Sequence, residues 1–245
     1  LTLGADDSVV AFDPGERRFT WFAGDGALGP IVGIAWLPGA TSSRTADRLA
    51  PGSWVAGQSG VAASDVPSQG RAGIVRTTAP LMLVSPDGTR SDTIGVFPAT
   101  ELEVGPAADG RRWTLARFAK RLSYAVSGDH IYVGTADRLE VDVYTADGKR
   151  VRSIRAPDVD VTLTPEMAAE FRSFLRARGS RDTAALERTI AALILPATVP
   201  AYSSLLVDAT GHLWVAEYRY DLGPARRYAV FDPDALHIGF AKITR

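Results

Sequence analysis

The sequence predicts an all-β fold, a β-propeller of four-stranded antiparallel blades interrupted by one two-helix insertion. Short runs of β-branched and aromatic residues alternate with Gly and Asp turns along most of the 245 residues. The order of these runs recurs at roughly forty residues once insertions are removed, which is the spacing of propeller blades. We expect about three and a half blades within a single, partial domain, 1-245.

The clearest repeat unit lies at 118-156, where four apolar runs are separated by tight turns. The segment 202-243 follows the same order, and the residues HLWV at 212-215 match HIYV at 130-133. A His therefore precedes the second strand of each unit, beside a turn. Because turn residues recur between blades while functional residues differ, the repeated His indicates an architectural role instead of catalysis or metal binding.

Two earlier segments match the unit less completely. The segment 31-98 contains a blade stretched by loops, one of them at about 40-51, and its Trp54 matches Trp214 of the last unit. The segment 7-23 matches only an outer hairpin, so it predicts half a blade.

The segment 163-195 has helical instead of strand periodicity. Thr164 and Pro165 supply an N-cap and a first helical residue, Gly179 ends the run, and Asp182 caps a second helix. We expect a helical hairpin whose apolar stripe packs on the propeller, with basic residues opposite it: Arg172, Arg176, Arg178, Arg181 and Arg188.

Composition excludes several classes of function. With 27 basic and 28 acidic side chains interspersed, the chain has no basic stripe for nucleic acid. It has no Cys, which excludes disulfides and thiolate zinc sites. No apolar run is long enough for a transmembrane segment.

The order of motifs resembles a known family. The run from FAKRLSY to VRSI at 118-154, the two-helix insertion, and then SSLLVDATGHLWV and YAVFDP resemble bacterial six-bladed β-propeller proteins of the NHL and TolB-like group. The resemblance implies a periplasmic, extracellular or lipoprotein-anchored protein. It also implies further blades before the chain and closing strands after it, so we expect a segment truncated at both ends.

Most carboxylates in the blades stand where turns are expected. Asp208 precedes Gly211, and Asp87, Asp147 and Asp234 occupy outer hairpins. Short acidic side chains at such positions accept hydrogen bonds from nearby backbone N–H groups. We therefore predict that these four residues stabilise turns.

Glu217 is the carboxylate that differs between blades. It follows the strand Trp214-Val215-Ala216, where the matching positions hold Gly57 and Thr135. With Tyr218 and Arg219 it forms a candidate site for a polar ligand at the mouth of the central channel. The alternative is a solvated ion pair with Arg219 or Arg226.

Two functions are compatible with these residues. One is a non-enzymatic scaffold of the bacterial cell envelope that binds an unidentified protein or small molecule, with no cofactor and no catalytic residue. The alternative is a metal-dependent hydrolase or lyase of the lactonase or esterase type, with its site in the central channel. Glu217 would then be a ligand for Ca²⁺. Catalytic propellers of the gluconolactonase-like and paraoxonase-like kind have Asn among their metal ligands, and this chain contains no Asn.

Overall fold

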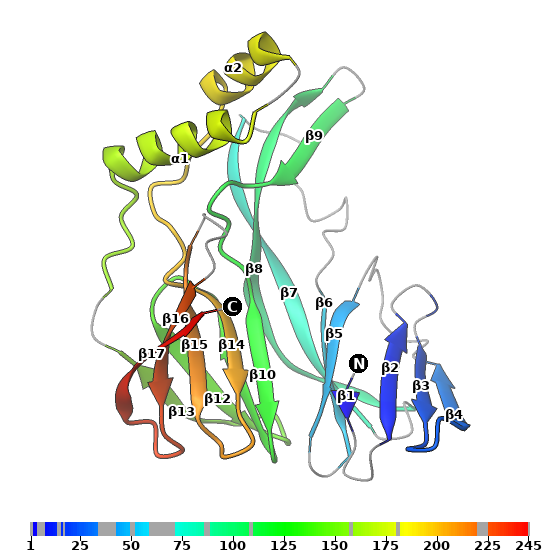
Figure 1. Cartoon of the computed structure of the whole chain (residues 1–245). Helices are drawn as coiled ribbons and strands as arrows, with labels where there is room; N and C mark the ends of the chain where they lie inside the picture. The colour runs from blue at the N-terminus through cyan, green and yellow to red at the C-terminus, as the bar shows by residue number, and fades with distance from the viewer. Residues whose placement is uncertain are drawn as a thin grey trace.

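Four antiparallel β-sheets stand side by side in chain order in the computed structural model (Figure 1). The structure describes residues 2-3, 8-13, 16, 18-33, 43-49, 52-58, 72-85, 89-107, 110-156, 159-179, 182-219 and 225-244.

The strands follow the chain within each sheet. The first sheet contains β1 (Thr2–Leu3), β2 (Val9–Asp13), β3 (Arg18–Phe22) and β4 (Leu28–Gly33). The second contains β5 (Ser43–Arg48), β6 (Trp54–Gln58), β7 (Gly73–Val84), β8 (Ser91–Ala107) and β9 (Gly110–Leu115). The third contains β10 (Ser123–Ser127), β11 (His130–Gly134), β12 (Glu140–Thr145) and β13 (Arg150–Arg155). The fourth contains β14 (Tyr202–Val207), β15 (Leu213–Glu217), β16 (Ala225–Phe231) and β17 (His237–Thr244).

Every sheet is an antiparallel meander in which sequence neighbours pair. The first strands of successive sheets also meet, because β10 contacts both β5 and β14. Meanders that stand face to face, with their first strands together, are the blades of a β-propeller. The predicted all-β fold class is therefore confirmed, and the insertion contains the two expected helices.

The strand boundaries differ from the expected segments in the first half of the chain. The hairpin at 7-23 is flanked by β1 and β4, so it forms the middle of a four-stranded sheet instead of an outer half-blade. The first strand of the second sheet is β5, in a segment expected to be a loop. Pairing with β6 supplies its backbone hydrogen bonds, and this tertiary pairing overrides a weak local strand propensity. The second sheet also extends beyond residue 98 to β9.

Alternating side chains of the second strands fill the spaces between sheets. Trp54 packs against Val10 and Phe19 of the first sheet, whereas Ile131 and Val133 pack against the second. Each of these residues faces the preceding sheet.

The expected match between Trp54 and Trp214 is therefore wrong by one residue. In the fourth sheet Leu213 and Val215 face the preceding sheet, and Trp214 points to the opposite face. A shift of one residue along a strand reverses the face of every side chain, so Trp54 is equivalent to Leu213.

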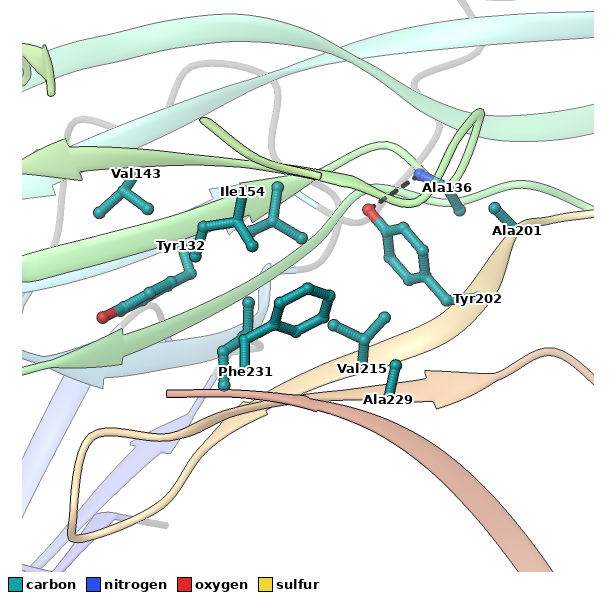
Figure 2. Packing of buried hydrophobic residues seen from close by; sticks show 11 residues of the cluster. Tyr132, Ala136, Val143, Ile154, Ala201, Tyr202, Val215, Ala229 and Phe231 are labelled. Atoms are coloured by element: carbon teal, nitrogen blue, oxygen red, sulfur yellow. Dashed lines mark hydrogen bonds between the residues drawn. The ribbon is translucent and has the colours of Figure 1, made fainter. Parts of the chain in front are cut away.

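At two interfaces between neighbouring sheets, a tyrosine of one sheet packs against a glycine of the sheet before it in the chain. The Tyr202 hydroxyl accepts a hydrogen bond from the Ala136 N–H at 3.1 Å, as Figure 2 shows. A Cβ atom placed on Gly134 would lie only 1.8 Å from that hydroxyl oxygen. Tyr124 repeats the arrangement, since its hydroxyl accepts from the Gly57 N–H at 3.2 Å. Glycine is thus required where the aromatic ring approaches the neighbouring backbone.

The last strand of the fourth sheet, β17, exposes large apolar side chains. Ile238 and Phe240 are each more than half exposed, and Arg227 lies over the Phe240 ring at 3.9 Å from its centroid. Trp214 lies on the opposite face, because it pairs with Val230, whereas Phe240 pairs with Ala229 on the face of Val215.

The insertion forms α1 (Pro165–Ala177) and α2 (Thr183–Ala191), which cover one end of the sheets beside the far ends of β7 and β8 (Figure 1). Thr164 caps α1 by accepting from the Met167 N–H, and Asp182 caps α2 by accepting from the Ala185 N–H. Gly179 ends α1 with a positive φ of 70°. These helix ends confirm the predicted caps.

We expect Gly134→Ala to lower the free energy of unfolding by about 3 kcal/mol, because the new methyl group collides with the Tyr202 side chain in a packed interface. Urea unfolding monitored by circular dichroism measures the change. Gly105→Ala, in an open part of β8 where a Cβ atom has no neighbour within 4 Å, is the matched control and should change stability by less than about 0.5 kcal/mol. Equal effects of the two substitutions would contradict the interface described here.

Candidate functional site: a cavity between the insertion and the propeller

A cavity of about 390 Å³ lies between α1, the segment that joins β9 to β10, and the end of the fourth sheet. We call it the rim cavity. Its size falls within the range of small-molecule sites. Aromatic side chains and arginines dominate its lining: Phe118, Phe171, Phe174, Tyr202, Tyr218, Arg117, Arg121, Arg178 and Arg219.

The segment between β9 and β10 carries Phe118 into the rim cavity. Phe118 is 4% exposed and has a left-handed φ of 54°, a conformation that is uncommon for a bulky residue. Such a residue persists only where surrounding contacts hold the backbone.

Glu101 in β8 provides those contacts. Its backbone C=O accepts from the Ala116 N–H, and its N–H donates to the Lys120 C=O, both at 3.1 Å. Its carboxylate also accepts from the Lys120 N–H at 2.8 Å. One residue therefore clamps both ends of the loop that carries Phe118.

A partly buried cluster of charges surrounds this clamp. Arg76 in β7 pairs with Asp137 at 2.8 Å, and Lys120 lies 3.6 Å from Glu101. Lys120 also donates to the Thr198 hydroxyl at 2.6 Å, on the chain that leads out of the insertion. Two cations and two carboxylates thus connect the second sheet, the third sheet and the insertion. Truncating one member would leave a charge of opposite sign poorly compensated.

Helix α1 supplies the opposite wall. Phe171 is 6% exposed and its ring lies 4.7 Å from that of Phe118, with Phe174 one turn further along the helix. The apolar stripe of α1 therefore packs on the propeller as predicted. Arg178 differs from the expectation, because it lines the cavity with its guanidinium 5.6 Å from the Phe174 ring centroid. Arg181 lies outside the described residues.

Tyr218 closes the cavity on the side of the fourth sheet, with its ring 6.4 Å from that of Phe118. Burial raises the pKa of Tyr218 to about 12, although Arg121 acts in the opposite direction. The phenol is therefore protonated at neutral pH and available as a hydrogen-bond donor.

The mouth of the rim cavity is positively charged. Arg117, Arg121, Arg178 and Arg219 are exposed, and none of the described lining residues is acidic. Within the described residues, Arg117, Arg121 and Arg178 have no carboxylate partner, while Arg219 donates to the Ala225 C=O at 2.7 Å. The cavity combines an apolar floor with a basic rim.

Two of the three predicted ligand-binding residues line the rim cavity. Tyr218 and Arg219 line the rim cavity, whereas the exposed Glu217 does not. Among the described residues Glu217 has no ion-pair partner. Because Trp54 is equivalent to Leu213, the residues equivalent to Glu217 are Gln58 and Thr135. The expected match between Glu217 and Gly57 is therefore wrong by one residue.

The carboxylates predicted to stabilise turns behave as expected in part. Asp208 accepts from the N–H groups of Thr210 and His212 and from the Trp214 indole at 2.8 Å. Asp147 bonds with the Thr145 hydroxyl and pairs with Lys149. In the last hairpin Asp232 accepts from the Leu236 N–H, a role expected for Asp234. Asp87 lies outside the described residues.

Several site residues were missed by the sequence analysis. Phe118 and Arg121 begin the repeat unit at 118-156, where the sequence pattern indicates strands and gives no sign of a binding role, and Glu101 lies beyond the blade expected at 31-98. A single Glu in a strand has no signal that reveals a loop clamp, because its partners join it only through the pairing of β8 and β9.

The described residues contain neither a cluster of metal-binding side chains nor a helix that could cross a membrane. Within them, no group of three or more His, Asp or Glu could hold a metal ion. No described helix is both long and apolar enough to cross a membrane.

The fold and its rim cavity define the chain as a propeller-type protein with a helical insertion over one end. No family model and no curated protein sequence matches it. Among solved structures, it is similar to virginiamycin B lyase from Staphylococcus aureus, with 10% identity, a TM-score of 0.41, and coverage of 99% of this chain and 68% of that one.

Two other solved structures have comparable likeness. A putative exported protein from Bacteroides fragilis has 10% identity and a TM-score of 0.43, with 99% of this chain and 56% of that one covered. A luciferin-regenerating enzyme has 12% identity and a TM-score of 0.41, with 94% and 56% covered. The chain thus spans little more than half the length of these two proteins. Likeness of this strength assigns no activity.

The pKa of Asp208 is held well below its usual range, first by the Thr210 and Trp214 side chains and then by backbone N–H groups. A lowered folded-state pKa contributes stability above the unfolded value of about 3.9, and that stability is lost as the pH falls further. We therefore expect Asp208→Asn to be less stable than the wild type at pH 7, with a difference that shrinks below about pH 4. Urea midpoints at pH 7, 5, 4 and 3 measure this.

The control for this prediction is Asp234→Asn, in a turn of the same sheet where the described residues offer its carboxylate no hydrogen bond. It should change the urea midpoint at pH 7 much less than Asp208→Asn does. A constant difference for Asp208→Asn would contradict the role assigned to its carboxylate.

Proposed function

We propose that this chain is part of a non-enzymatic binding scaffold of the bacterial cell envelope, within the NHL and TolB-like group of six-bladed propellers. The order of motifs over 118-243 supports the group. The rim cavity supports binding, because its aromatic floor and its basic mouth are the features by which a protein holds and orients a small ligand.

The observation that carries this proposal is the strained, clamped position of Phe118. Glu101 holds a bulky residue at a positive φ, and the ring forms the cavity floor against Phe171. Strain of this kind concentrates at functional sites. Among the described residues, the other non-glycine residues with a positive φ are Ala136 and Ala235, so Phe118 is the one bulky side chain held in this conformation.

The alternative function is a metal-dependent hydrolase or lyase in which Glu217 binds Ca²⁺. Glu217 lies outside the rim cavity, so the two functions use different residues and separate tests distinguish them.

We expect an apolar dye such as N-phenyl-naphthylamine to bind in the rim cavity, and Ala119→Trp to weaken that binding at least about tenfold by filling the space. Fluorescence titration measures the dissociation constant. Phe240→Ser is the matched control: it removes an exposed aromatic ring from β17, outside the cavity lining, and should leave the wild-type dissociation constant unchanged. Binding that survives Ala119→Trp but is lost in Phe240→Ser would refute the rim cavity as the site.

We expect neither Ca²⁺ nor EDTA to change the melting temperature by more than about 1 °C. A metal that binds only the folded state at a hundred times its dissociation constant would add about 2.7 kcal/mol, which is easily detected. Differential scanning calorimetry with and without millimolar Ca²⁺ is the measurement. A rise of several degrees that disappears in Glu217→Gln would support the hydrolase or lyase alternative.

A further inference from the structure

We infer that the ligand of the rim cavity is a small amphipathic organic acid, with an aromatic or alkyl body and one anionic head group. This inference rests on the proposed binding function and adds the chemical class of the ligand. It follows from how apolar and charged side chains are distributed between the floor and the mouth.

The apolar body fits the floor. Phe118 and Phe171 are nearly buried and pack at an interplanar angle of 58°, and Phe174 and Tyr218 extend the aromatic surface. Each ring can contact an aromatic or alkyl group without a specific hydrogen bond. An ion without an apolar part, such as inorganic phosphate, would leave this aromatic surface without a partner.

The head group fits the mouth. Four arginines line the cavity, and no described lining residue opposes them with a negative charge. A guanidinium binds a carboxylate or sulfonate through paired N–H donors, so several arginines around one opening favour an anion. The protonated Tyr218 phenol can add one further donor.

The three arginines without a carboxylate partner among the described residues come from two parts of the chain. Arg117 and Arg121 belong to the segment clamped by Glu101, and Arg178 is the C-cap residue of α1. The positions of Arg117 and Arg121 therefore depend on the contacts that place Phe118, and that of Arg178 depends on the packing of Phe171 in α1 against Phe118. Floor and mouth are parts of one structure instead of two adjacent surfaces.

The test compares two probes that share one body. Anilinonaphthalene sulfonate and N-phenyl-naphthylamine differ in the sulfonate group, so the ratio of their dissociation constants isolates the contribution of the anion. We expect the sulfonate probe to bind the wild-type chain at least about tenfold more tightly, because hydrogen bonds from a guanidinium to an anionic group are stronger than those between neutral groups. Raising the salt concentration should reduce this ratio.

Substitutions of single arginines test whether the preference for the sulfonate probe arises at the mouth of the rim cavity. Arg178→Gln and Arg121→Gln should each weaken the sulfonate probe about three- to tenfold and leave the neutral probe unchanged. Arg172→Gln, on the same helix but outside the cavity lining, is the control and should change neither. Octanoate should displace the sulfonate probe from the wild type, and octanol should do so less effectively.

The outcomes separate the two proposals. Equal binding of both probes, with both lost in Ala119→Trp, would overturn the organic-acid inference and leave the proposed binding function intact. Failure of both probes to bind the cavity would overturn the proposed function itself. A sulfonate preference that persists in the Arg121 and Arg178 variants, or that is lost in Phe240→Ser, would also overturn the inference, because the anion would then bind elsewhere.

Discussion

The close approach of Tyr202 to Gly134 is the contact on which the candidate site depends. It joins the third and fourth sheets and holds the turn after β11 through the Ala136 N–H (Figure 2). That turn contains Asp137, which pairs with Arg76 of the second sheet. The packing between two blades is thereby continuous with the charge cluster that supports the cavity.

Glu101 positions the loop that forms the floor of the rim cavity. Its backbone and carboxylate hold both ends of the loop that carries Phe118, and Lys120 links the loop to the exit of the insertion. A partly buried carboxylate with two cations nearby is a costly arrangement unless its hydrogen bonds are satisfied. Here they are satisfied by the loop itself, so the charge cluster orders the segment that forms the cavity floor.

The rim cavity lies where a repeated structure meets a unique one. The blades repeat the same meander and the same packing of tyrosine over glycine, and this repetition accounts for stability. In the part of the chain that the structure describes, the helical insertion occurs once, and it supplies Phe171 and Arg178 to the cavity. A ligand site at this junction can be specific to one place in the propeller, because the other blades have no α1 to form its second wall.

The sequence by itself determined the meander class, the two helices and their caps, because turn residues, strand alternation and N-cap side chains act within a few residues of one another. It also predicted Tyr218 and Arg219 as ligand-binding residues; both line the rim cavity, and their role in binding stays a prediction. Tertiary structure alone decided the register that separates Trp54 from Trp214, the strand at 43-48, and the meeting of Glu101, Phe118 and α1. Those features depend on partners far along the chain, and a pattern of local residues carries no information about which distant backbone will supply the missing hydrogen bonds.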